Sequence, residues 1–257
     1  MRAKRRRHGA TPMREEQPWR FPWMGVFALV LLVGISAAGW LGIQHLADPA
    51  VMPVNTVRIA SPMQQVSQQQ VRELILPHAE VGFLRLSATA VREELEALPW
   101  VQHASVRRAW PDVLVIAITE QQAVARWAAG GLLNPQGEMF LPEDLSAWTH
   151  LPLLRGPDGT QKQVMQAYRS KLAMIAPLKL QITHVSMDER RAWSLQLNDS
   201  LHLGLGRSDV ERRLLRFVRV YHGVLEPRLA AIESVDMRYT NGFAIRWRDG
   251  MEPPAAA

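Results

Sequence analysis

The residue types that most often carry chemistry do not assemble a catalytic or metal-binding motif in this sequence. No two histidines stand three or four residues apart; they are His8, His45, His78, His103, His150, His184, His202 and His222. The chain has no cysteine, which excludes thiolate metal sites, a cysteine nucleophile and a disulfide scaffold. The sequence therefore predicts no catalytic residue, no metal site and no cofactor, and so no enzyme.

Two short motifs resemble functional sites but have simpler readings. The segment Gly204-Leu205-Gly206 lacks the third glycine of a dinucleotide-binding loop and fits a strand end better. The segment Asn198-Asp199-Ser200 matches a glycosylation sequon, but its composition is that of a tight turn. A run of arginines at helical spacing predicts a solvated helix face: Arg212, Arg213, Arg216 and Arg219.

The basic charge is concentrated at the N-terminus. The 257 residues carry a net charge of +6, of which the first 20 residues contribute +5. The remaining chain is close to neutral, so the charge indicates a topology signal that contacts inner-membrane lipid head groups. No nucleic-acid partner is expected.

An uncharged stretch, residues 21–47, follows the basic tail directly. Its 20-residue core, residues 24–43, spans about 30 Å as a helix, the thickness of the hydrocarbon layer of a bilayer. A cleaved signal peptide would have a shorter apolar core and a small-x-small cleavage site, so we expect a transmembrane helix over 24–46. The excess of Lys and Arg before the span places residues 1–23 in the cytoplasm and the rest outside.

The part after the span predicts an α+β protein with two modules. Residues 52–120 form a strand–helix–helix–strand–strand pattern, in which 54–59 is a strand and 113–119 a central strand covered on both sides. Ser67-x-x-Gln70 is a capping box for a helix that Pro77 should end near Leu76, and a second helix starts at Ala88.

Residues 121–250 are predicted to be rich in strands with flanking helices, and 251–257 to be a short tail. A turn at 134–137 joins two strands. A helix over 160–175 has an apolar stripe, and a second capping box, Ser208-x-x-Glu211, opens a helix through about Val220. The stripe residues are Val164, Tyr168, Leu172 and Ile175.

Two hairpins can be placed in register from their apolar alternation. A three-residue loop at 198–200 pairs Leu197 with Leu201 and Leu195 with Leu203, which keeps the leucines on one face. A three-residue loop at 240–242 puts Gly242 in a left-handed conformation and makes the last strand, 243–248, a candidate sheet edge. Its pairs would be Tyr239 with Phe243, Met237 with Ile245 and Val235 with Trp247.

Several segments together resemble the FtsQ/DivIB family of bacterial cell division proteins over residues 24–248. The order of tail, span, small α/β module and β-rich module resembles the family as well. The matching segments are Leu98-Pro99-Trp100-Val101, Ser105-Val106-Arg107-Arg108-x-Trp110-Pro111-Asp112, Ala125-Arg126-Trp127, Arg191-x-Trp193, Leu203-x-Leu205-Gly206-Arg207 and Val235-Asp236-x-Arg238-Tyr239, with Gly242 and Trp247 following.

This resemblance implies a non-enzymatic, single-pass type II scaffold of the divisome that links early and late division proteins at the septum. Residues 52–120 would be a polypeptide-transport-associated (POTRA) domain, and 121–250 an FtsQ-type β domain. FtsB and FtsL would bind the β domain, with FtsB adding a strand beside the last strand. FtsK, FtsW, FtsI and FtsN are further partners that the resemblance suggests.

The resemblance also implies which residues contact the partners. They are Arg191, Arg238, Tyr239, Asn241, Gly242, Phe243 and Trp247. Phe243 departs from the family, which often has a small residue after the glycine. Two other functions remain open from the sequence: a POTRA-bearing protein that handles polypeptides in envelope assembly, and a membrane-anchored cell-wall enzyme.

Overall fold

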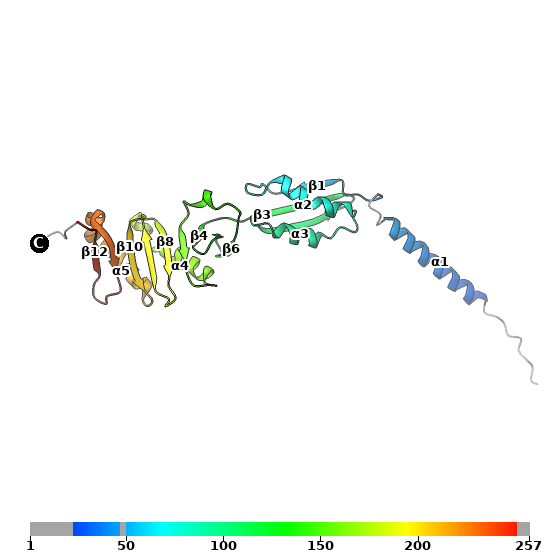
Figure 1. Cartoon of the computed structure of the whole chain (residues 1–257). Helices are drawn as coiled ribbons and strands as arrows, with labels where there is room; N and C mark the ends of the chain where they lie inside the picture. The colour runs from blue at the N-terminus through cyan, green and yellow to red at the C-terminus, as the bar shows by residue number, and fades with distance from the viewer. Residues whose placement is uncertain (1–22, 47–49, 251–257) are drawn as a thin grey trace, which may run out of the picture.

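The computed structural model describes residues 23–46 and 50–250 (Figure 1). The chain is elongated, with an isolated helix at one end, a three-stranded unit in the middle and a nine-stranded sheet that runs to the other end. The architecture is mixed α and β, which confirms the predicted fold class. The basic tail before Trp23 and the residues after Gly250 lie outside the described residues.

The isolated helix is α1, Trp23–Leu46. Its described side chains are exposed, and it is the one helix of the described chain that is long and apolar enough to cross a membrane. Because apolar residues surround this helix on all sides, water is an unfavourable environment for it. The helix is consistent with the predicted single transmembrane span.

The first unit packs two helices on a small sheet in the order β1–β3–β2. Its elements are β1 Thr56–Ile59, α2 Gln68–Glu80, α3 Ala88–Glu96, β2 Val101–Ala109 and β3 Val113–Glu120. Strand β3 is central, as predicted, and its Leu114 and Ile116 are fully buried among α2 and α3 side chains. On its other face Val115 is buried, but Val113 and Ala117 are only half-buried, so the expected cover on that side is partial.

Helix α2 begins as predicted and ends later than predicted. The Ser67 hydroxyl accepts the N–H of Gln70, and the Gln70 side chain accepts the N–H of Ser67, which completes the capping box. The helix passes Pro77 and ends at Glu80, so the expected stop at Leu76 is wrong. Proline in the last turn removes one N–H from the ladder, and only three residues follow it.

The loop before α2 is tied to the end of β3 by one carboxylate. Glu120 accepts the N–H groups of Gln64, Gln65 and Val66 at 2.8–3.0 Å. These bonds are charge-assisted, and they join segments more than 50 residues apart in the chain. The carboxylate therefore fixes where α2 starts relative to the central strand.

The second unit is a nine-stranded sheet in the order β12–β11–β10–β9–β8–β7–β4–β5–β6. Its strands are β4 Ala125–Trp127, β5 Leu132–Leu133, β6 Met139–Phe140, β7 Leu153–Arg155, β8 Ile182–Met187, β9 Trp193–Leu197, β10 Leu201–Gly206, β11 Ile232–Asp236 and β12 Ala244–Trp247. The pairs β4/β7, β7/β8 and β10/β11 are parallel, and the others are antiparallel.

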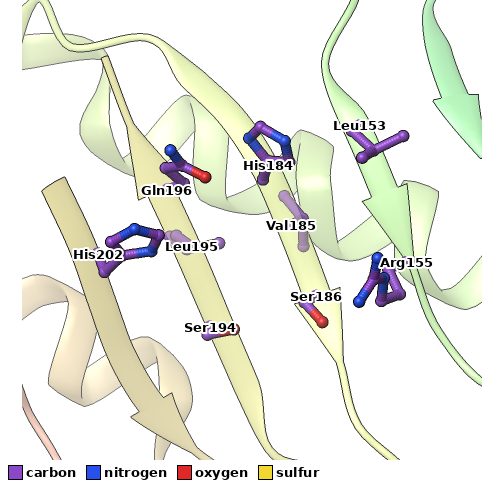
Figure 2. A pocket seen from close by; sticks show the side chains of 9 residues that line it. All are labelled: Leu153, Arg155, His184, Val185, Ser186, Ser194, Leu195, Gln196 and His202. Carbon is purple, nitrogen blue, oxygen red and sulfur yellow. The ribbon is translucent and has the colours of Figure 1, made fainter. Parts of the chain in front are cut away.

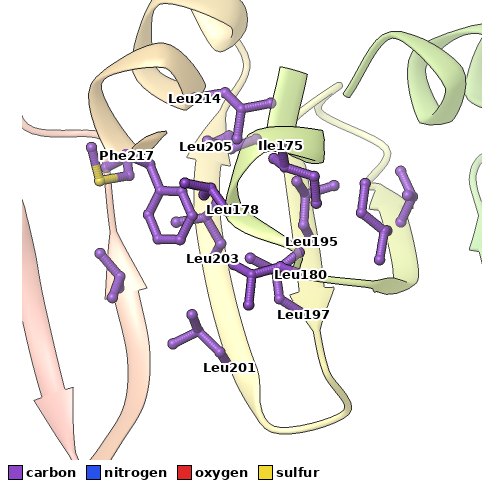
Figure 3. Close-up of a cluster of buried hydrophobic side chains, with 14 of the residues drawn as sticks. Ile175, Leu178, Leu180, Leu195, Leu197, Leu201, Leu203, Leu205, Leu214 and Phe217 are labelled. Carbon is purple, nitrogen blue, oxygen red and sulfur yellow. The ribbon is translucent and has the colours of Figure 1, made fainter. Parts of the chain in front are cut away.

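The helices of this unit lie on one face of the sheet and bury its leucines (Figure 3). They are α4 Gln161–Ile175 and α5 Val210–Val220, with short helical turns η1 Ser146–Trp148, η2 Ala176–Leu178, η3 Tyr221–Leu225 and η4 Glu226–Ala231. Leu214 and Phe217 of α5 are fully buried against Leu203 and Leu205 of β10. The burial of these side chains fixes α5 on the sheet.

The β9–β10 hairpin has the predicted register. Leu197 lies opposite Leu201, and Leu195 opposite Leu203. The alternation of leucine with polar residues was therefore enough to predict the register. The loop residues Asn198 and Asp199 have left-handed backbones, with φ of 46° and 55°. The turn at 134–137 is also found between β5 and β6, and Asn134 closes it by accepting two backbone N–H groups.

The predicted register of the last hairpin is wrong. Val235 lies opposite Ile245 rather than Trp247, and a seven-residue loop, residues 237–243, replaces the three-residue turn. The Asp236 carboxylate accepts the N–H of Arg238, which turns the chain away from the strand direction after Asp236. Gly242 is not among the residues with positive φ, because the longer loop does not require a left-handed residue there.

Two helix predictions in this unit are also corrected. The expected capping box at Ser208 and Glu211 does not form, because Asp209 has a left-handed backbone (φ 52°) and makes no side-chain cap. On α4, Leu172 is 39% exposed and Lys171 is buried in its place. The Lys171 ammonium lies 4.4 Å from the ring centroid of Trp193, a cation–π contact that accounts for its inward position.

We expect Glu120→Gln to loosen the start of α2. The amide keeps one acceptor oxygen but loses the charge, so the folding free energy of the first unit should fall by about 1–2 kcal/mol. Hydrogen exchange of the amides of residues 64–66 should accelerate in the full chain. Glu93→Gln, an exposed carboxylate on α3, is the matched control and should leave these amides unchanged; equal protection in both variants would contradict the assigned role.

Candidate functional site

Strand β12 is a free edge of the large sheet. It pairs with β11 on one side and with no described strand on the other, which confirms the predicted edge position. The backbone N–H of Arg248 donates to the carbonyl of Ala231 at 2.9 Å. Because the backbone groups of successive residues in a strand point to opposite sides, those of Ile245 and Trp247 point to the free side. Such an edge can accept another strand.

The opposite edge of the sheet, β6, lies beside the first unit. Its Phe140 ring is 5.1 Å from the ring of Trp100, which precedes β2, and Trp148 is 5.2 Å from the same ring. Figure 1 shows β6 near the first unit and β12 at the far end of the molecule. Of the two edges of the large sheet, β12 is therefore the one that lies away from the first unit.

The loop that precedes β12, residues 237–243, carries most of the site residues predicted from the sequence. Tyr239 is 58% exposed and Asn241 is exposed, so both are accessible. Arg238 donates to the Asp236 carboxylate through Nε and Nη2, with the shortest distance 2.6 Å. The hydrogen bonds from Arg238 hold the pKa of Asp236 below its usual 3.8, so the pair is ionised at neutral pH. Its contribution to stability is complete above pH 3.8 and is lost as the pH falls through the lowered pKa.

The loop is held by one arginine from α5 that the sequence assigned to a solvated face. Arg216 donates to the carbonyls of Thr240, Met237 and Tyr239 at 2.7, 2.8 and 2.8 Å. Arg213 of the same helix donates to the carbonyl of Leu205 at 2.6 Å. Both side chains are half-buried, so the prediction of a solvated face is wrong for these two residues.

The two aromatic residues that bracket β12, one just before the strand and one at its end, face partly inward. Phe243 and Trp247 are half-buried and pack against the core of the second unit, while Gly242 is half-buried beside them. These residues can therefore present only part of their surface to a partner. The core packing accommodates Phe243 despite its size.

Arg191 lies in the β8–β9 turn, away from the hydrogen-bond network of the 237–243 loop. It has a left-handed backbone (φ 63°) and donates to the side chain of Gln163 on α4 at 2.8 Å. A groove of about 380 Å³ nevertheless links this turn to the loop, because Asp188 and Ala192 line it together with Arg238. The structure thus brings six of the seven predicted residues together at β12 and leaves Arg191 outside the groove lining, bonded to α4.

The face of the sheet opposite the helices is polar and was missed by the sequence reasoning. A second hollow, of about 270 Å³, is lined by His184 and Ser186 of β8, Ser194 and Gln196 of β9 and His202 of β10 (Figure 2). Burial holds the pKa of His184 below its usual value. The sequence carried a signal for this face, because exposed or partly exposed residues alternate with buried apolar ones along β9 and most of β10, and from His184 onward along β8.

The described residues contain no group of three or more His, Asp or Glu side chains placed to hold a metal ion. The carboxylates near the site are engaged elsewhere: Asp236 binds Arg238, and Asp188 accepts the N–H of Ala192. The arrangement at β12 suits backbone pairing combined with contacts from exposed side chains.

We expect Arg216→Met to release the 237–243 loop while α5 stays in place. Methionine preserves the apolar part of the side chain but cannot donate, so three carbonyls lose a charge-assisted bond and stability should fall by about 2–3 kcal/mol. Hydrogen exchange should increase in residues 237–243, with α5 itself remaining protected. Arg219→Met, an exposed arginine one turn later, is the matched control; an equally ordered loop in Arg216→Met would refute the role.

Comparison with known families matches both units of the chain. Residues 125–238 match the family model for the C-terminal domain of the cell division proteins FtsQ and DivIB. Residues 52–121 match the model for the FtsQ-type POTRA domain. Together the two matches cover well over half of the sequence and both folded units.

Individual relatives are similar over nearly the whole chain. A cell division protein FtsQ of Xanthomonas campestris is 33% identical over 91% of this chain and 86% of its own length. Those of Hahella chejuensis and Escherichia coli are 34% and 31% identical over 88% and 86% of this chain, and over 77% and 83% of their own lengths. The matched models and these relatives agree in both modules, and the chain belongs to the FtsQ family of bacterial cell division proteins.

Proposed function

We propose that this chain is a bitopic scaffold of the divisome that captures FtsB, and through it FtsL, by strand addition at β12. Membership of the FtsQ family supports a role in division and other divisome proteins as partners. The observation that carries the proposal is the unpaired edge of β12 at the far end of the sheet. Backbone pairing there would supply affinity, and neighbouring side chains would supply selectivity.

The side chains around the edge fit this selective role. Tyr239 offers an exposed aromatic ring beside the strand, and Trp247 offers the outer part of a half-buried one. Arg238 is exposed although paired, so it can share its charge with a partner carboxylate. We include Asn241, Gly242 and Phe243 in the surface, together with Arg191 from the neighbouring β8–β9 turn, which a partner would have to draw away from Gln163.

The proposed topology follows the charge and the apolar helix. Residues 1–23 would be cytoplasmic, 24–46 would cross the inner membrane, and the POTRA domain (52–120), the β domain (121–250) and the tail (251–257) would be periplasmic. In this arrangement the chain acts by binding and not by catalysis. The POTRA surface remains available for further division proteins at the septum, among them FtsK, FtsW, FtsI and FtsN.

We expect Tyr239→Ala combined with Trp247→Ala to abolish FtsB capture by the full-length protein. Two aromatic anchors at the edge would be lost, so affinity should fall by about 100-fold or more. Capture is measured by co-purification from membranes and by titration of the reconstituted protein. Undiminished capture by the folded double variant would disprove the site.

Two further variants separate binding from folding. Tyr239→Ala alone removes a ring that is 58% exposed, so it should weaken capture without a loss of stability. Trp110→Ala with Leu141→Ala removes two residues that are 79% and 61% exposed on other parts of the surface. This control should capture FtsB as the unmodified chain does.

Cysteine crosslinking tests the strand geometry directly, because the natural chain has no cysteine. Ala244→Cys places a thiol at an exposed position of β12. With a series of single cysteines in FtsB, disulfide yields should peak at every second FtsB residue, as strand pairing requires. A period of three to four residues, or equal yields with the α3 control Thr89→Cys, would contradict strand addition.

A further inference from the structure

A second feature beside β12 is a concentration of positive charge on α5. Arg212, Arg213, Arg216 and Arg219 line a groove of about 230 Å³, whose other wall is formed by Tyr239 and Thr240. The only carboxylate in its lining is Asp209. We name this feature the α5 arginine groove.

The four arginines divide into two pairs with different roles. Arg213 and Arg216 are half-buried and donate to backbone carbonyls, although the buried Nε of Arg216 has no partner among the described residues. Arg212 and Arg219 are exposed, and neither has a hydrogen bond or an ion pair with any described residue. The outer pair therefore has its full set of donors available to a ligand.

The spacing of these charges is unfavourable in the free protein. Arg212 and Arg216 are four residues apart, and Arg216 and Arg219 are three apart, so they are neighbours on the helix surface and repel one another. Asp209 is the one carboxylate in the groove lining, and Asp236 outside it interacts with Arg213, which leaves the two outer arginines without a neighbouring carboxylate partner among the described residues. An anion placed between the outer arginines would relieve the repulsion and could accept paired hydrogen bonds from a guanidinium.

We propose that the α5 arginine groove binds carboxylate side chains in an acidic segment of the partner that adds its strand to β12. This inference rests on the proposed function. One wall of the groove is the same loop that positions Tyr239 beside the edge strand, so a chain paired with β12 passes within reach of it. Charge complementarity then selects an acidic segment next to the added strand.

The position of the groove favours a peptide over a lipid head group as the source of the anion. Figure 1 places α5 and β12 at the end of the molecule opposite α1, with the first unit between them. The membrane that α1 would cross is therefore remote from the groove. A protein partner can reach it.

The test uses the full-length protein in nanodiscs of zwitterionic lipid. Fluorescent hexaglutamate is the probe, and hexaglutamine of the same length is the uncharged control peptide. Arg212→Glu with Arg219→Glu should weaken hexaglutamate binding by about tenfold or more at low ionic strength, because two attractive charges become repulsive. Arg72→Glu with Arg169→Glu changes the net charge equally at two exposed arginines elsewhere, and it should bind the probe as the unmodified chain does.

The same variants are then tested for capture of FtsB, the partner used in the β12 crosslinks. The groove variant should capture it more weakly, and the dependence of capture on salt should be reduced. Three results would overturn the proposal. The control variant could lose as much hexaglutamate binding as the groove variant, or the unmodified chain could bind hexaglutamine as tightly as hexaglutamate. The unmodified chain could also bind phosphatidylglycerol vesicles but fail to bind hexaglutamate. If crosslinks at β12 recur at every second FtsB residue but the groove variant captures FtsB normally, the role of the groove is refuted and the edge-strand function stands. If those crosslinks are absent, the edge-strand function and the role of the groove are both refuted.

Discussion

The guanidinium of Arg216 joins the helix layer of the second unit to the end of its sheet. The 237–243 loop has few ladder bonds of its own, and three of its carbonyls depend on this one side chain. Arg216 is in turn held by α5, which is anchored by the fully buried Leu214 and Phe217. The position of Tyr239 beside β12 thus follows from core packing on the far side of the helix, through a chain of contacts that is rigid at each step.

The edge strand combines accessibility with features that limit unwanted pairing. It has only four residues, it pairs with β11 across a bulge between Ile232 and Ser234, and Arg246 and Arg248 place charges along it. Short length, local irregularity and charge are the means by which natural sheets discourage edge-to-edge aggregation. The other edge of the large sheet lies beside the first unit, where Phe140 of β6 packs against Trp100. The edge at β12 faces away from that unit, and its short length, bulge and charges restrict what can pair with it.

The sequence predicted those features that depend on local pattern. The β9–β10 register follows from alternating leucines, because a slip of one residue would expose Leu195 and Leu203. The last hairpin could not be predicted in the same way: a slip of two residues keeps Val235 and Ile245 on the same face, so the pattern does not separate the two registers. The observed register is instead favoured by the Asp236–Arg238 contact and by the bonds from Arg216, which lies more than 20 residues earlier in the chain than Met237.

The free energies involved indicate why an edge strand of this length would need additional contacts to hold a partner. Only Ile245 and Trp247 direct backbone groups outward, so pairing adds at most four hydrogen bonds, worth about 1 kcal/mol each after exchange with water. Loss of translational and rotational freedom on association costs about 4–15 kcal/mol, so backbone pairing alone would not hold a partner. In the proposed topology, a span in the same membrane as the partner would raise the effective concentration and reduce that cost. In the proposed complex, aromatic and arginine contacts near β12 would supply the remainder, and Tyr239 and the α5 arginines lie together at the loop that precedes this strand.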